Sequence, residues 1–230
     1  MTASALPTYP ESGPSEELVA KRPRGRPRKT EEERDDGNRR QALLTAAARL
    51  FRDQGFDATS TRDIAAAVGM HSGSPFYHFK SKDALLFSVM EEGMQAALAR
   101  QTMALRGVSS AVNDLPAHAP LVQIRRLIRA HFDTLLGPGN DFVPVMLYEY
   151  RSLSAAQRAS LARLQADYES AWTPVLEALH ASGHLHAPVK LARLLILGAL
   201  NWSVQWFDPA KGASLDELTD AALALFLKES

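Results

Sequence analysis

The sequence of 230 residues predicts an all-α protein with two folded domains, an N-terminal three-helix domain containing a helix-turn-helix and a larger helical body. Three observations predict this architecture. Apolar residues recur at helical spacing along most of the chain, and no stretch shows the alternation typical of a β-strand. Capping boxes, Ser154 with Gln157 and Ser214 with Glu217, stand where helices should begin. Loops rich in glycine and proline separate the helical stretches.

Composition excludes several classes of protein. The chain has no cysteine, which rules out disulfides, zinc fingers and thiolate chemistry. Its longest apolar run, residues 194–200, is far shorter than the ~20 residues of a membrane span. The N-terminus lacks the apolar segment of a signal peptide. We therefore expect a cytoplasmic protein that does not enter a membrane.

The N-terminal part of the chain is basic although the net charge is zero. Residues 21–82 hold 14 basic and eight acidic side chains, an asymmetry that favours a nucleic-acid partner at one end of the molecule. Residues 1–37 are predicted to be a disordered arm with a basic segment at 21–29. Its centre, Arg24-Gly25-Arg26-Pro27, resembles an AT-hook, which lies in the minor groove of A·T-rich DNA. The alternative is a solvated basic tail that binds phosphates without entering the groove.

The first folded helix is expected over residues 38–54, capped by Asn38 and ended by Gly55. Its apolar side chains fall on one face. Arg39 and Arg40, near its start, would lie at the phosphate backbone of bound DNA.

The helix-turn-helix is expected over residues 59–80. Thr59 or Ser60 can cap its first helix, and Gly69 ends that helix. We expect the second helix to begin at Ser72, whose hydroxyl is a good cap. The exposed positions of the second helix carry small or hydrogen-bonding side chains, which suit the major groove of DNA. An ordinary helical hairpin within a core is the alternative.

The landmarks of this region resemble the DNA-binding domain of the TetR family of bacterial transcriptional repressors. They are Leu50-Phe51, Gly55-Phe56, Thr59-Ser60, Asp63-Ile64-Ala65, Val68-Gly69, Gly73-Ser74, Tyr77-His78-Phe79, Ser81-Lys82 and Leu85-Leu86. Two residues depart from the family pattern: Pro75 replaces an aliphatic residue and His71 replaces a serine cap. Proline is tolerated in a first helical turn, where the N–H groups have no partner within the helix.

The resemblance implies a DNA-binding domain over residues 38–82 and a ligand-binding and dimerisation domain over residues 83–230. A long helix capped by Ser81 would join them, with Lys82 directed at a phosphate. The residues expected to contact DNA are Arg24, Arg26, Arg39, Arg40, Thr59, Ser60, Thr61, Arg62, His71, Ser72, Gly73, Ser74, Phe76, Tyr77, His78, Lys80 and Lys82.

The body is predicted to contain only helices. They are expected at residues 121–136, 143–153, 155–180, 188–207 and 215–227, with a kink at Pro174. The last two helices carry enough apolar residues to form a four-helix bundle with a second copy, although they would also complete a monomer core. A homodimer would place two recognition helices on the half-sites of a palindromic operator in double-stranded DNA.

The body also offers candidates for a small-molecule pocket, each of which is equally suited to a core. They are Met90, Met94, His131, Tyr148, Tyr150, Arg151, Trp172, Trp202 and Trp206. Residues 198–209 resemble TetR-family members that respond to acyl-CoA thioesters, with Arg125, Arg126 and Arg129 as possible partners of the CoA phosphates. The expected function is a repressor that a small molecule, such as an acyl-CoA, releases from its operator.

The alternative function is a ligand-independent architectural or global protein that binds A·T-rich DNA. We expect neither catalysis nor a cofactor, because no nucleophile elbow, phosphate-binding glycine loop or apolar carboxylate pair occurs. No metal site is expected either. His180, His184 and His186 lie close together, but Gly183 interrupts the helix that would align them.

Overall fold

The computed structural model describes residues 31–73, 75–106, 119–137, 139 and 141–228 of the chain. Within these ranges all regular structure is helical and no strand occurs. The elements are α1 (Glu31–Gln54), α2 (Thr61–Ala67), α3 (Pro75–His78), α4 (Lys82–Leu105), α5 (Ala119–Leu136), α6 (Phe142–Glu149), η1 (Tyr150–Ser152), α7 (Ala155–Ser170), α8 (Thr173–Ala181), α9 (Val189–Trp202), η2 (Ser203–Gln205), η3 (Pro209–Lys211) and α10 (Leu215–Phe226). The all-α fold is therefore confirmed.

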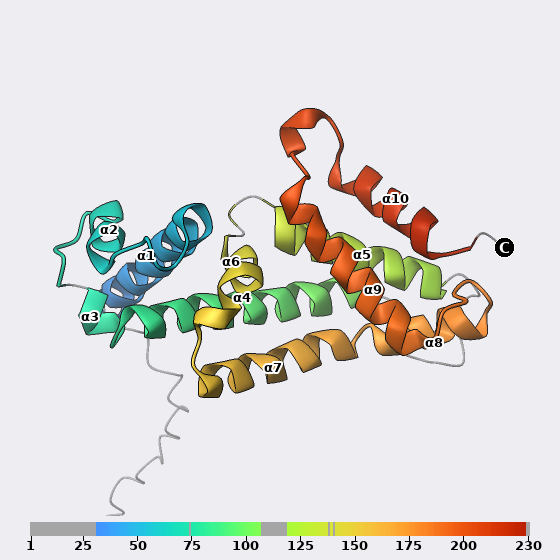
Figure 1. Ribbon diagram of the computed structural model, residues 1–230, viewed down its shortest axis with the longest axis horizontal. Coiled ribbons are helices and arrows are strands. Elements are labelled where there is room, and N and C mark those ends of the chain that lie inside the picture. The colour runs from blue at the N-terminus through green and yellow to red at the C-terminus, as the bar shows by residue number, and fades with distance from the viewer. Residues whose placement is uncertain (1–30, 74, 107–118, 138, 140, 229–230) are drawn as a thin grey trace, which may run out of the picture.

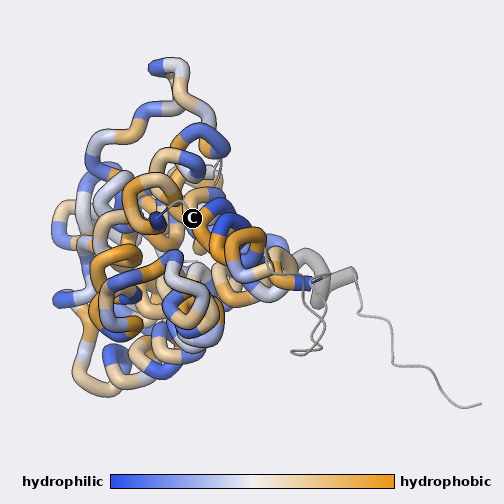
Figure 2. Tube along the Cα trace, turned by 90° about the vertical axis from the view of Figure 1, so that its right-hand side faces the viewer, coloured by the Kyte–Doolittle hydropathy of each residue, from blue (hydrophilic) through white to orange (hydrophobic). Residues whose placement is uncertain are grey.

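The molecule is elongated, with a head made of α1, α2 and α3 at one end and the body at the other (Figure 1). Helix α4 runs from the head into the body and packs against α1, α5, α6 and α7. Seen from the end of the body, hydrophobic and hydrophilic stretches alternate along the helices, as expected of amphipathic helices around one core (Figure 2). The buried apolar side chains of head and body form one continuous cluster. Head and body therefore share one packed core.

Helix α1 begins earlier than predicted, at Glu31 rather than at Asn38. The acidic residues at 31–36, which we predicted to belong to the disordered arm, are thus helical. Negative side chains are stabilised at a helix N-terminus by the helix dipole, which accounts for this extension. The helix ends as predicted at Gly55, whose φ of 84° few other residues adopt. The basic segment at 21–29 lies outside the described residues.

The first helix of the helix-turn-helix is confirmed. Ser60 caps α2 and forms a capping box with Asp63, which lowers the pKa of the Asp63 carboxyl through hydrogen bonds to Ser60. Gly69 follows α2 with a φ of 67°. The second helix was predicted too early, because α3 begins at Pro75 and not at Ser72. Proline favours the first helical position, where its fixed φ is already helical and its missing N–H has no partner to lose.

Capping residues in the sequence predicted the starts of several helices of the body. Ser81 caps α4, and the capping boxes at Ser154 and Ser214 open α7 and α10 as predicted. We predicted a single kinked helix over residues 155–180, but the chain forms two helices. The first ends at Ser170 and α8 begins at Thr173, with Pro174 in its first turn. Proline at this position starts a new helix more readily than it bends an existing one.

Two further helices are shorter than predicted. Helix α6 ends at Glu149 and continues as the 3-10 turn η1, and α9 ends at Trp202 and continues as η2. Tightening of the last turn is common at helix ends. None of the helices in the described part of the chain is long and apolar enough to cross a membrane.

Candidate functional site

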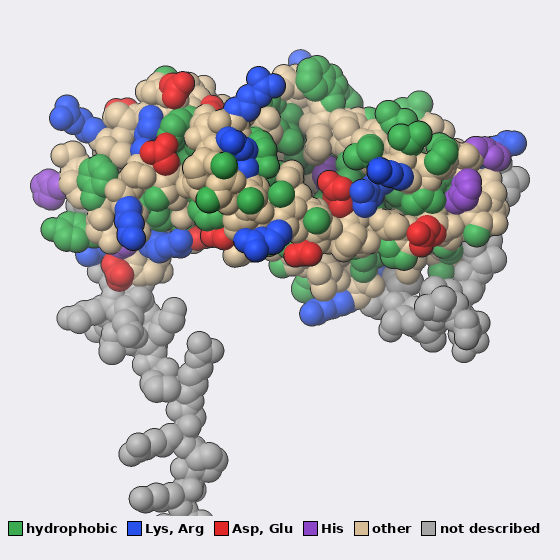
Figure 3. Space-filling model, turned by 60° about the horizontal axis from the view of Figure 1, so that its bottom comes forward, with side chains coloured by type: hydrophobic (Ala, Val, Ile, Leu, Met, Phe, Trp, Pro, Cys, Tyr) green, Lys and Arg blue, Asp and Glu red, His purple; other side chains and the backbone are tan. Residues whose placement is uncertain are grey.

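The head presents a small polar surface built from the start of α2, the turn before α3, and α3 itself. Tyr77 on α3 is 91% exposed and Phe76 is also exposed. Beside them is a hollow lined by Ser60, Thr61, Arg62, Asp63 and Ser72. The head end of the molecule in Figure 3 carries several exposed basic side chains. Aromatic, hydroxyl and basic groups on one short surface can contact base edges and phosphates together.

Most of the residues predicted to contact DNA lie on or near this surface. His71, Ser72, Gly73, Lys80 and Arg39 are exposed, and Thr61 is half-buried. Ser74, Arg24 and Arg26 lie outside the residues whose placement is described.

Four of the predicted DNA contacts are instead engaged within the protein. Thr59 is 1% exposed, and its hydroxyl donates to the carbonyl oxygens of Gly55 at 2.8 Å and Leu50 at 3.3 Å. The side chain of His78 is only 8% exposed, and its Nδ1 lies 3.6 Å from Asp36 Oδ1. The prediction that Thr59 and His78 face DNA is therefore wrong, because both side chains point into the head.

The two cations of this group hold the head to α4. Arg40 donates to Glu92 Oε1 at 2.6 Å and lies over the ring of Phe79. Lys82 Nζ donates to the carbonyl oxygens of Phe56 at 2.8 Å and Thr59 at 2.9 Å. We predicted that both cations contact DNA phosphates, but each is held by groups of the protein instead. These contacts could not be predicted from local sequence patterns, because each partner lies more than 20 positions away.

The body contains a small cavity of about 90 Å³ between α4, α5, α6, α7 and α9. Its lining residues are Met94, His131, Thr134, Val143, Met146, Leu147, Gln165, Tyr168, Glu169, Leu197 and Asn201. Apolar walls with a few converging polar groups are typical of small-molecule sites.

A hydrogen-bonded chain of three side chains forms the polar part of this cavity. His131 Nε2 lies 3.1 Å from Asn201 Oδ1, so this nitrogen carries the hydrogen. His131 Nδ1 then accepts from the Tyr168 hydroxyl at 2.8 Å. Burial lowers the pKa of His131 to about 4 and raises that of Tyr168. Both groups therefore remain neutral at physiological pH, and the cavity suits a neutral ligand group.

The buried imidazole makes a testable contribution to the pH dependence of stability. Because the pKa of His131 falls from about 6.5 in the unfolded chain to about 4 in the fold, the unfolded state binds more protons between these values. The neutral His131 imidazole contributes fully to the free energy of unfolding above pH 6.5. This contribution declines by roughly 3 kcal/mol as the pH falls towards 4. We expect the unfolding free energy of His131→Gln, measured by urea titration, to fall less over this range. His186→Gln, at an exposed histidine, should behave as the wild type does.

The other predicted ligand-binding residues are dispersed. Trp172 is fully buried and meets the edge of His131, and Met90 is buried in the core. Tyr150 donates to the Arg158 carbonyl, and Arg151 is exposed. We did not predict Tyr168 or Asn201. Asn201 was identifiable as the polar residue that follows the apolar run at 194–200.

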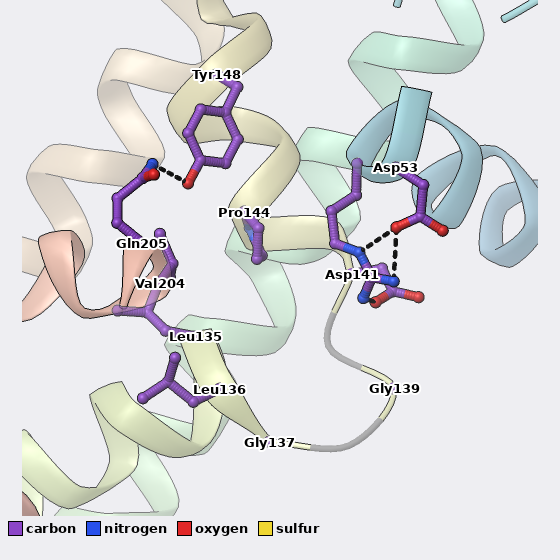
Figure 4. A pocket seen from close by; sticks show the side chains of 11 residues that line it. Asp53, Leu135, Leu136, Gly137, Gly139, Asp141, Pro144, Tyr148, Val204 and Gln205 are labelled. Carbon is purple, nitrogen blue, oxygen red and sulfur yellow. Dashed lines mark hydrogen bonds and ion pairs between the residues drawn. The ribbon is translucent and has the colours of Figure 1, made fainter. Parts of the chain in front are cut away.

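An open groove of about 770 Å³ lies between the end of α1, the end of α5, α6 and η2 (Figure 4). Tyr148 accepts a hydrogen bond from Gln205 Nε2 at 2.5 Å across it. The cation of the groove, Arg52, pairs with both Asp53 and Asp141. The groove therefore has excess negative charge and is a poor site for an anion.

The arginines proposed for CoA phosphates are largely engaged as well. Arg125 and Arg129 form ion pairs with Asp216 of α10, and Arg125 also pairs with Asp220. Their role in the fold is to fasten α10 to α5.

The end of the body carries an exposed apolar face. Leu195 is 66% and Trp202 is 65% exposed, although both belong to a largely apolar helix. The face comprises Leu191, Leu194, Leu195 and Trp202 of α9, Trp206 after η2 and Leu225 of α10. Hydrophobic side chains gather at the upper right of Figure 3, over the part of the body to which α9 belongs. Large apolar side chains that stay exposed on two neighbouring segments of the chain are candidates for an interaction surface.

Comparisons with known proteins agree with this architecture. A family model for bacterial regulatory proteins of the tetR family matches residues 43–89, and one for the tetracyclin repressor-like C-terminal domain matches residues 118–229. The transcriptional repressor KstR2 of Mycolicibacterium smegmatis is 27% identical over 83% of this chain and 89% of its own length.

Solved structures share the fold. The crystal structure of superantigen PfiT is 38% identical, covers 83% of this chain and 97% of that chain, and has a TM-score of 0.66. The crystal structure of AibR in complex with isovaleryl coenzyme A and operator DNA is 24% identical over 82% of this chain and 97% of that chain, with a TM-score of 0.67, and shares the fold. This chain belongs to the TetR family of bacterial regulatory proteins and is a helix-turn-helix transcriptional regulator, not an enzyme.

Proposed function

We propose that the protein is a homodimeric repressor that acts in the cytoplasm, binds a palindromic operator through its two heads and is released by a small molecule held in the body. The observation that carries this proposal is the placement of α4. This helix joins the head that presents Tyr77 to the body cavity that Met94 lines. One rigid element is thus shared by the DNA-binding surface and the candidate effector site.

The apolar face of α9, η2 and α10 supports the dimer. Large exposed side chains such as Leu195 and Trp202 would be removed from water by a second copy. A twofold axis through this face would present two α3 helices to the half-sites of a palindrome. In this arrangement, residues 38–82 form the DNA-binding domain and residues 83–230 the ligand-binding and dimerisation domain.

The cavity supports a short acyl thioester as the effector. Its apolar walls suit a small hydrocarbon group, and the neutral chain of Tyr168, His131 and Asn201 suits a carbonyl rather than a charged group. AibR, which shares the fold, has been crystallised with isovaleryl coenzyme A and operator DNA. At about 90 Å³ the cavity accommodates only the acyl end, so the CoA portion would extend outside it.

Release would follow from a population shift. The effector prefers an arrangement of the body in which the two heads have the wrong spacing for the operator. Its effect on DNA affinity is limited by its differential affinity for the two arrangements.

The proposal is tested by selecting duplexes from a random DNA library with the purified protein. We expect an inverted repeat that binds ~10³-fold or more tightly than random DNA at physiological salt. A panel of short acyl-CoAs, with free CoA as the control, should then weaken binding to the selected duplex. A preference for A·T-rich DNA without a defined repeat would instead favour the architectural alternative. If the repeat is found but no acyl-CoA acts, only the effector class is wrong.

A further inference from the structure

The turn between α1 and α2, residues 55–59, is held from two different helices. Lys82 at the start of α4 donates to the carbonyl oxygens of Phe56 and Thr59. Glu149 at the end of α6 accepts from the backbone N–H of Phe56 at 2.9 Å through its Oε1. A Cβ at Gly55 would lie 3.5 Å from the same oxygen. The position of this turn, and hence the start of α2, therefore depends on both α4 and α6.

Glu149 is fixed for this contact by its neighbours. Ser152 in η1 donates to Glu149 Oε2 at 3.1 Å, which leaves Oε1 facing the Phe56 N–H. Hydrogen bonds to an ionised carboxylate are stronger than neutral ones. At the other end of α6, Asp141 pairs with Arg52 of α1. Both ends of α6 are thus connected to the C-terminal part of α1 and the turn that follows.

Helix α6 also forms a wall of the small body cavity, to which it contributes Val143, Met146 and Leu147. Its first residue, Phe142, crosses α4 at Gly93. A Cβ placed on Gly93 would lie 2.8 Å from Phe142 Cβ, so α6 has no room to move towards α4 at this point. Groups packed this closely transmit strain to one another.

We propose that Glu149 is the positioning residue that couples the occupancy of the cavity to the orientation of the head. This inference rests on the proposed function, since it names the path by which the effector acts. A group that enlarges the cavity pushes on Met146, and α6 tilts about the contact between Gly93 and Phe142. The far end of α6, about 10 Å away, moves the Phe56 N–H through Glu149 while Lys82 holds the carbonyl side of the turn. The start of α2 then rotates relative to α4.

The experiment replaces the effector by a larger side chain, so that it needs no knowledge of the natural ligand. Met146→Trp fills the cavity from α6, and Val143→Phe serves as a second filling variant. Met103→Trp makes the same chemical change at an exposed site on α4 outside the cavity. Each is measured in three backgrounds: wild type, Glu149→Ala and Glu149→Gln. The readouts are the affinity for the duplex selected by the wild-type protein and hydrogen exchange at the Phe56 amide.

We expect Met146→Trp to reduce affinity for the selected duplex by roughly tenfold in the wild type, within the usual range of coupling between sites. Glu149→Gln keeps an oxygen that accepts from Phe56, so the loss should persist there. In the Glu149→Ala background, Met146→Trp should reduce DNA affinity by less than about threefold, because the hydrogen bond from the Phe56 N–H is missing. The Phe56 amide should exchange faster in Met146→Trp than in Met103→Trp.

Two results would overturn the inference, and they differ in what they say about the proposed function. An equal loss of affinity in the wild-type and Glu149→Ala backgrounds would leave effector control intact but assign the coupling to another path. If neither filling variant changes DNA affinity or Phe56 exchange in the folded wild-type background, the cavity itself does not communicate with the head. In that case both the inference and the proposed effector site fail, whereas failure to select any duplex would reject the DNA-binding proposal alone.

Discussion

Replacing Leu195 by glutamate is expected to convert the proposed dimer to a monomer and to reduce affinity for the selected operator by at least ~100-fold. The side chain is 66% exposed on α9 and belongs to the apolar face. In a twofold dimer the substitution places two carboxylates in one apolar interface, where each unpaired charge costs several kcal/mol. A monomer reads only one half-site and loses the contacts of the other. Analytical ultracentrifugation and operator titration measure the two effects.

The matched control is Met103→Glu, which introduces the same charge at an exposed apolar residue of α4 outside this face. It should remain dimeric and bind the operator as the wild type does. A Leu195→Glu protein that still sediments as a dimer would show that another surface forms the interface. A Leu195→Glu protein that remained dimeric but bound the operator weakly would show that the apolar face is not needed for dimerisation. The exposure of this face would then require a different explanation.

Replacing Tyr77 by alanine is expected to reduce operator affinity by roughly 100-fold without lowering thermal stability. Tyr77 is 91% exposed, so its truncation opens no cavity in the fold. A side chain that contacts DNA contributes about 1–3 kcal/mol, and each dimer has two copies. Operator titration at several salt concentrations and a thermal melt are the measurements.

Tyr77→Phe separates the hydroxyl from the ring. If the hydroxyl contacts a phosphate, this variant should weaken binding to all sequences by a similar factor. Val122→Ala on α5, which also removes an exposed apolar side chain, is the control and should leave affinity unchanged. Wild-type affinity in Tyr77→Ala would show that α3 does not face DNA.

The sequence predicted those parts of the fold that depend on residues close together in the chain. The capping box of Ser60 with Asp63 and the glycine termini at Gly55 and Gly69 are local devices, and each is present. The start of α3 was misplaced because two local signals competed. Ser72 favours a cap and Pro75 favours a first helical position, and proline prevailed because its φ is fixed.

The candidate sites were less predictable because they depend on contacts distant in sequence. Lys82 and His78 fit a family pattern of DNA contacts, yet both are occupied by groups of the protein itself. The chain of Tyr168, His131 and Asn201 brings together three helices, and no spacing rule relates them. Glu149 likewise meets Phe56 across 93 positions, so only the folded arrangement identifies it.

The brevity of α3 has a consequence for how operator preference can change. This helix is a single turn anchored by Pro75 and His78, while the residues around it that face outward contribute little to the interior. Within about a dozen positions, the side chains that are proposed to contact DNA therefore differ from those that stabilise the fold. Exchanging Ser72, Phe76 and Lys80 for the corresponding residues of a relative should redirect the protein to a new promoter while its melting temperature stays the same. Related regulators can diverge in their targets by this route without compensating changes elsewhere.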